Sequence, residues 1–213
     1  MRQYRMNASS ITQLATGRIV LKRLADGEPM VADKADAAAL RLVWPAPGAL
    51  RRPVPVPDTS GSRPTKPQTL TFAIEVERSG VVAGLASLSD VDLEHARAAL
   101  GPLWTTSVLP DAVLISHTTY LLLQFGLDVL GWQRIELRTA TGADDARKTF
   151  STFGFRREGV LRSYEIGADG ESCDLTVWSV IQPQWHDVSA RLQAAMARAD
   201  APWGDRLPSI MPP

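Results

Sequence analysis

The alternation of apolar and polar residues predicts strands in the first half of the chain. Residues 18–24 alternate as a half-buried strand does. Residues 70–77 and 81–88 have the composition of two further strands, and the turn at 78–80 between them indicates an antiparallel hairpin. A strand over 96–104 would extend this hairpin into a meander.

Helices and strands alternate in the second half of the chain. Apolar spacings of three and four residues predict helices there, and strict alternation predicts strands. Gly131 and Gly154 stand where helices are expected to end. The expected elements are a helix over 111–130, a strand over 132–139, a helix over 144–153, strands over 155–166 and 173–181, and a helix over 185–199.

The order of these elements predicts one α/β (α+β) domain with a mixed sheet. A further short helix is expected over 33–43, where alanine and leucine are frequent. We place an N-terminal extension at 1–17, the domain at 18–187, and the end of the last helix with a C-terminal tail at 188–213. The 213 residues are enough to bury a full core.

Residues 44–68 interrupt the pattern with seven prolines. Proline removes a backbone donor and fixes its own φ, so regular structure is not expected in this loop. The loop is either a plain flexible connection or a segment that covers the substrate or contacts a polyanion. The second interpretation depends on four basic residues, which only one acid opposes: Arg51, Arg52, Arg63 and Lys66, with Asp58.

The composition excludes several classes of protein. Lysine plus arginine and aspartate plus glutamate both number 23, so the net charge gives no steering toward nucleic acid or anionic membranes. The single cysteine, Cys173, excludes an intramolecular disulfide framework, and three scattered histidines lack the spacing of a metal site. No run reaches the roughly 20 apolar residues of a membrane span, and residues 1–10 lack the apolar stretch of a signal peptide. We therefore expect a cytoplasmic protein with no membrane partner.

Several short motifs together carry a resemblance to a known family. Each is weak alone, but their order and spacing are specific for a fold. They are VAGLASL at 82–88, ALG at 99–101, Trp104, YLLL at 120–123, IELRT at 135–139, FGF at 153–155 and EGVLR at 158–162. In these motifs the chain resembles the GCN5-related N-acyltransferases (GNAT), in the branch that includes the ribosomal-protein N-acetyltransferases. The resemblance covers roughly 18–187 and implies the GNAT fold, a mixed, mostly antiparallel twisted sheet flanked by helices.

The resemblance implies a donor site after the strand that ends near Trp104. In relatives this strand splays from its neighbour to admit the pantetheine of acetyl-CoA, and a glycine-rich loop cradles the pyrophosphate. Residues 107–116 contain no glycine, Pro110 has no N–H, and Asp111 adds a negative charge. We therefore expect acetyl-CoA to be disfavoured and no cofactor to be held. The donor-binding candidates are Trp104, Thr105, Thr106, Ser107, Asp111 and Ser116.

Residues that assist proton transfer in relatives are missing here. Relatives often carry an Asn three residues before a Ser or Ala, at the positions of Ala143 and Ala146, and other branches carry a Tyr where Phe150 stands. The catalytic candidates that remain are a histidine that could titrate near neutrality and two residues of the last hairpin, near the family's acceptor cleft. They are His117, Tyr164 and Asp174, and ordinary helix-face or strand-surface roles are the alternatives for them.

Three functions fit this pattern. The first is an N-acyltransferase that moves an acyl or aminoacyl group to a small-molecule or peptide amine from a donor other than free acetyl-CoA. An aminoacyl-tRNA or an acyl carrier protein would be that donor, with the basic loop meeting its phosphates, and the biosynthesis of a specialised metabolite would be a natural setting. The second is a catalytically silent GNAT-like binding protein, and the third is an acetyl-CoA-dependent N-acetyltransferase with an atypical loop. The oligomeric state stays open.

Overall fold

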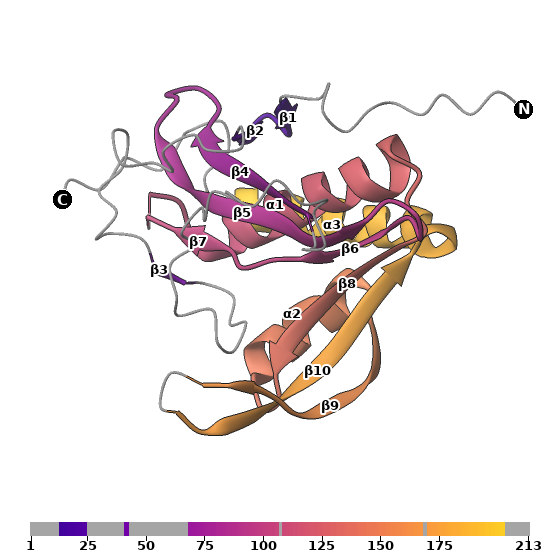
Figure 1. Cartoon of the computed structure of the whole chain (residues 1–213). Coiled ribbons are helices and arrows are strands. Elements are labelled where there is room, and N and C mark those ends of the chain that lie inside the picture. Colours follow the sequence, from indigo (N-terminus) through magenta and orange to yellow (C-terminus); the bar gives the residue numbers. More distant parts are fainter. Residues whose placement is uncertain (1–12, 25–40, 43–67, 107, 168–169, 203–213) are drawn as a thin grey trace, which may run out of the picture.

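The described strands form one mixed sheet, and the described helices lie against one of its faces (Figure 1). The computed structural model describes residues 13–24, 41–42, 68–106, 108–167 and 170–202. The elements are, in chain order, β1 (Gln13–Ala15), β2 (Ile19–Arg23), β3 (Arg41–Leu42), β4 (Gln68–Val76), β5 (Val82–Asp92), β6 (Arg97–Leu100), β7 (Trp104–Thr105), α1 (Asp111–Leu123), the π-helix η3 (Gln124–Val129), β8 (Arg134–Ala140), α2 (Asp144–Phe153), β9 (Arg156–Ile166), β10 (Ser172–Ile181), the 3-10 helix η4 (Gln182–Gln184) and α3 (Trp185–Asp200).

The strand order across the sheet is β1-β2-β4-β5-β6-β8-β10-β9. Among the described strands, only β6 and β8 run parallel, and all other pairings are antiparallel. The predicted mixed, mostly antiparallel sheet flanked by helices is therefore confirmed.

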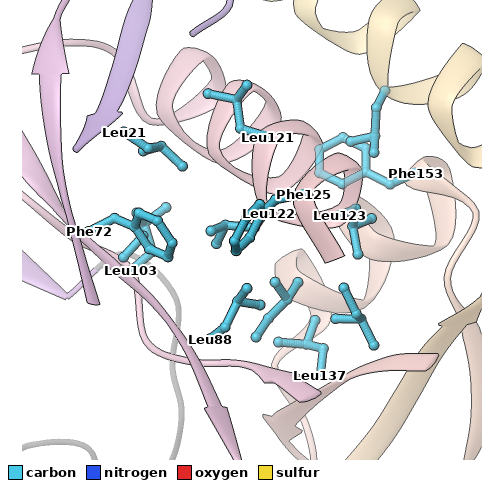
Figure 2. Close-up of a cluster of buried hydrophobic side chains, with 14 of the residues drawn as sticks. Leu21, Phe72, Leu88, Leu103, Leu121, Leu122, Leu123, Phe125, Leu137 and Phe153 are labelled. Carbon is cyan, nitrogen blue, oxygen red and sulfur yellow. The ribbon is translucent and has the colours of Figure 1, made fainter. Parts of the chain in front are cut away.

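The hydrophobic core lies between the sheet and the helices (Figure 2). Leu122 and Phe125 point from the long central helix toward Phe72 of β4, and Leu123 lies toward Phe153 of α2. Each such buried side chain contributes about 1.5–3 kcal/mol to folding. The segment Asp111–Val129 has the length and apolar composition of a membrane span, but most of it is buried against the sheet and α3, as in a core helix.

Short or irregular elements differ from the sequence predictions. Strand β1 lies within the expected N-terminal extension and pairs with β2. The prediction of a helix over 33–43 is wrong at its end, because Arg41 and Leu42 form strand β3, which pairs with β7. Residues 33–40 lie outside the described residues. The strand expected over 96–104 is two strands, β6 and β7, and the long helix continues as a π-helix from Gln124. Two-residue strands and changes of helical pitch leave no periodic signal, so pattern reasoning misses them.

Gly84 allows β7 to pack closely against β5. A Cβ atom at this position would lie 2.0 Å from the Trp104 carbonyl oxygen and 3.1 Å from the Thr105 Cα atom. Both atoms belong to the backbone, so they can give way only if β7 moves. The glycine is therefore required by this close approach.

We expect Gly84→Ala to displace β7 and destabilise the protein by about 1–3 kcal/mol, because overpacking against backbone cannot be relieved by a rotamer change. In a chain of this size that corresponds to a Tm lower by roughly 3–10 °C in thermal unfolding. Gly159→Ala is the matched control, since a Cβ there would meet no atom within 4 Å. Equal Tm values for the two variants would contradict the assigned role of Gly84.

Candidate functional site

The sheet divides into two halves at the end of β6. Strands β6 and β8 pair in parallel up to Leu100 and Leu137. After β6 the chain no longer pairs with β8 and stays beside β5. Strand β7 pairs with β5, and the Thr106 N–H donates to a β5 carbonyl at 2.9 Å. Strand β8 continues to Ala140 and, among the described strands, pairs there with β10 alone. The halves therefore diverge between β7 and the end of β8.

Three donor-binding candidates lie on or next to β7. The Trp104 indole nitrogen is buried and has no hydrogen-bond partner. Thr105 is fully buried, and the Thr106 hydroxyl donates to the Val82 carbonyl at 3.2 Å. These threonine side chains pack against the sheet, so the group that β7 offers toward the divergence is its main chain.

The other donor-binding candidates lie around the start of α1, which follows β7 after a short loop. Pro110 is the N-cap, and its ring has no atom that could accept a hydrogen bond from the first turn. Asp111 stands in that first turn, where a carboxylate is favoured by the helix dipole. Ser116 is buried and its hydroxyl donates to the Ala112 carbonyl at 2.6 Å, so it is engaged within the helix. Ser107 lies outside the described residues.

Strand β8 carries charged side chains on the sheet face opposite the helices. Ile135 and Leu137 are fully buried in the core, so Arg134, Glu136 and Arg138 point the other way. We call the face that bears these three side chains the front face. The alternation of charged and apolar residues over 134–138 is visible in the sequence, where it predicts the strand but not the partners of its charged side chains.

Arg138 is the first residue of β8 beyond its pairing with β6, and acids lie on both sides of it. Its Nη1 lies 3.1 Å from Asp90 Oδ2 on β5, and its Nη2 donates to Glu136. The Tyr164 ring centre lies 5.6 Å from its guanidinium carbon. Burial alone would lower the pKa of Arg138, but the charge of Glu136 and the other groups around it outweigh burial and raise this pKa. The guanidinium therefore stays charged beside the divergence.

A second ion pair extends this network to β9. Arg134 donates to both oxygens of Glu158, each at 2.6 Å, and lies 3.1 Å from Glu136. The Ser179 hydroxyl donates to Glu158 at 2.7 Å. The hydrogen bonds from Arg134, helped by Ser179, hold the pKa of Glu158 at about 2. Charged groups thus span the front face from β9 to β5.

Tyr164 and Asp174 both lie on the last hairpin, but only Tyr164 faces solvent beside Arg138. Tyr164 is 48% exposed. Asp174 Oδ1 accepts the N–H of Ser163 at 2.8 Å, where φ is 47° and the β9 register shifts, so Asp174 supports a bulge. Glu165 was missed by the sequence analysis. Its Oε2 is buried without a hydrogen-bond partner, and burial raises the pKa of this carboxyl against the opposing charge of Arg138.

His117 lies in a separate buried network that joins α1 to α3 and to the turn after β1. The ring is 2% exposed, its Nδ1 shares a hydrogen bond with the Thr16 hydroxyl at 2.7 Å, and its Nε2 lies 3.3 Å from Asp200 Oδ2. The second contact lacks hydrogen-bond geometry and is electrostatic. Arg18 pairs with the same aspartate at 3.2 Å. The structure therefore does not bring His117 together with Tyr164 or Asp174.

The position expected to carry a proton donor in relatives is part of the core. Phe150 is 2% exposed, and its ring makes edge contacts with Phe153 and Phe155. The polyanion-binding candidates Arg51, Arg52, Arg63 and Lys66 lie outside the described residues. In the part of the chain that the structure describes, no group of three or more His, Cys, Asp or Glu side chains is placed to hold a metal ion.

Solved structures share this fold at low sequence identity. A GCN5-related N-acetyltransferase from Brucella melitensis is 23% identical with a TM-score of 0.64, over 85% of this chain and 84% of that one. A protein from T. thermophilus assigned as an acetyltransferase is 24% identical with a TM-score of 0.61, over 86% and 96%. The spermidine/spermine N-acetyltransferase SpeG from Vibrio cholerae is 18% identical with a TM-score of 0.51, over 57% and 69%. No family model and no curated protein matches.

The chain therefore has the fold of the GCN5-related N-acetyltransferases. The expectation that it holds no cofactor and disfavours acetyl-CoA is wrong, because the structures that share its fold are acetyltransferases, which use acetyl-CoA as cosubstrate. That expectation equated the loss of glycines with the loss of the site. The structure has diverging strands, and the helix α1 begins after them. The N-cap residue Pro110 makes no side-chain hydrogen bond to the first turn, so it does not compete with an anion for the N–H groups there.

The buried network of His117 predicts a pH-dependent stability. Burial lowers the pKa of His117 below its ordinary 6.5, although Asp200 opposes this. A depressed pKa means that the unfolded state binds the proton more readily, so this contribution to stability is lost as the pH falls below about 6.5. We expect His117→Gln to cost about 1 kcal/mol at pH 8 through the lost Thr16 bond, and to flatten the fall in stability between pH 7 and 5.5.

Urea unfolding at several pH values measures this effect. His186→Gln is the control, since His186 is an exposed residue of α3. Parallel pH profiles for the wild type and His117→Gln would contradict the assignment.

Proposed function

We propose that this protein is an N-acyltransferase that moves an acyl group from acyl-CoA to the amine of a small molecule. The observation that carries the proposal is the divergence of β7 and β8 within a GNAT fold, followed by the start of α1. A sheet that opens in this way offers an extended ligand a strand edge on one side and charged side chains on the other.

The donor would lie along β7 with its phosphates toward α1. When bound, acyl-CoA supplies a thioester already activated for attack by an amine. The main chain of β7 would hold the donor's extended arm, and the first turn of α1 would meet its phosphates through backbone N–H groups and the helix dipole. Asp111 in this turn sets how much negative charge the phosphates meet.

The acceptor would enter from the front face. Asp90 and Glu136 pair with Arg138, Glu136 and Glu158 pair with Arg134, and the charge of Arg138 also acts on Glu165, so these four acids outnumber the two arginines beside the divergence. Such a surface attracts an ammonium ion and favours amines over carboxylates. Glu165, whose pKa is raised, would be a better proton acceptor than an ordinary carboxylate, and Tyr164 has a proton to give to a departing thiolate. The acceptor class agrees with the name of the spermidine/spermine N-acetyltransferase that shares part of the fold.

Several finer expectations stay predictions. Membership of the ribosomal-protein branch rests on the sequence motifs alone. The cytoplasmic location rests on the expectation that the sequence has no membrane span and no signal peptide. A donor carried by tRNA or by a carrier protein depends on the basic loop, which lies outside the described residues. The biosynthetic setting rests on the divergence of the sequence from the family's donor loop. A catalytically silent protein would show no turnover at all, which makes turnover the deciding observation.

The proposed function is tested by release of free thiol from acetyl-CoA in the presence of amines. We expect spermidine and other primary amines to give a saturable rate, and mass spectrometry to find the acceptor heavier by one acetyl group. Reactions without acceptor, and with the corresponding carboxylates, are the controls. Absence of an acetylated product with any amine of a broad panel would contradict the proposal.

Tyr164 should contribute to the rate and not to the fold. Its phenol is exposed beside Arg138, so we expect Tyr164→Phe to lower kcat about 10²-fold with an unchanged Tm, because the ring remains and only the proton donor is lost. Ile166→Ala, an exposed residue of the same strand, is the control and should retain full activity. Full activity in Tyr164→Phe would exclude this tyrosine as the acid.

A further inference from the structure

The edge of β7 that faces the divergence is already occupied by the chain itself. Strand β3 pairs with β7 in antiparallel register, Arg41 opposite Thr105 and Leu42 opposite Trp104. Strand β5 holds the other edge of β7, where Leu85 lies opposite Trp104. A strand has two hydrogen-bonding edges. Strand β3 therefore pairs with the edge of β7 that faces away from β5, on the side where β6 pairs with β8.

This pairing uses the same groups that the donor needs. The pantetheine arm of acyl-CoA is an extended chain with two amides, and an extended chain binds an exposed strand through main-chain hydrogen bonds. The side chains of β7 pack against the protein: Thr105 is fully buried and Trp104 packs against Val82 and Leu85. The hydroxyl of Thr106, the next residue, donates to the Val82 carbonyl. The β7 main chain cannot pair with β3 and with the donor arm at once.

We propose that Arg41–Leu42 is an internal competitor for the donor edge, which acyl-CoA displaces when it binds. The inference rests on the proposed function, since it needs acyl-CoA as the ligand. A pairing of two residues is short, and main-chain hydrogen bonds contribute little net free energy each. The competitor therefore lowers the apparent affinity for the donor without closing the site, and acceptor binding at the front face does not depend on it.

The test is calorimetric titration of the full chain with CoA and with acetyl-CoA. In Arg41→Pro/Leu42→Pro both N–H groups of β3 are removed and the strand cannot pair normally. We expect this variant to bind CoA about three- to tenfold more tightly than the wild type. Arg41→Ala/Leu42→Ala keeps the main chain and is the matched control, with an affinity close to that of the wild type. Thermal unfolding checks that each variant is folded.

If the folded proline variant binds CoA as tightly as the wild type or more weakly, β3 is not a competitor for the donor, while the proposed function stays intact. Absence of CoA binding by both the wild type and the proline variant would remove both proposals. Hydrogen exchange gives an independent measurement in the wild type. With saturating CoA, the one amide of residues 41–42 that faces β7 should exchange faster, while the amides of 104–105 stay protected. If the β3 amide that faces β7 stays as protected with CoA as without it, the proposed displacement of β3 is wrong.

Discussion

The rest of the structure depends on the point after β6 at which the chain stops pairing with β8. Up to Leu100 the sheet is continuous, because β6 and β8 share hydrogen bonds. Beyond it, β7 keeps β5 as its neighbour but no longer pairs with β8, and Gly84 lets the β5 and β7 backbones approach more closely than any side chain would permit. The end of the pairing with β8 separates the sheet halves, leaves the second edge of β7 to β3, and precedes the start of α1.

Strand β8 performs two tasks because its side chains alternate. Ile135 and Leu137 hold the core together, while Glu136 and Arg138 set the charge beside the opening. The ion pairs of Arg138 lie partly exposed, where such contacts contribute little to stability. Their consequence is electrostatic: with the ion pairs of Arg134, they fix two guanidinium groups among several carboxylates at the place where an amine would enter. Stability comes from the opposite face, so the front face is free to specialise for an acceptor.

The sequence predicted the regular elements and missed the long-range contacts. The hairpins, the helix that ends at Gly154 and the fold itself follow from periodicity, turn residues and family motifs, and the left-handed φ of 97° at Gly154 is what a helix C-cap requires. Strand β3 and the division of the strand expected over 96–104 into β6 and β7 left no pattern in the sequence, because a strand of two residues has no periodicity. The partners of His117 lie 101 residues away at Thr16 and near the end of α3, so spacing along the chain could not reveal them.

The candidate site was predicted only in part, and for a physical reason. Tyr164 was predicted from its place on the last hairpin and stays a prediction, whereas no signal in the sequence indicated Arg138 and Glu165, whose neighbours lie on other strands. The error about acetyl-CoA came from treating glycine as the sole source of accessible backbone donors, although a helix N-terminus provides such donors by its geometry.

A crystal structure of the protein with bound CoA tests the central claim most directly. The account predicts that the pantetheine arm lies between β7 and the end of β8, with the pyrophosphate at the first turn of α1. CoA bound at any other surface, with no part of it between β7 and the end of β8, would contradict it.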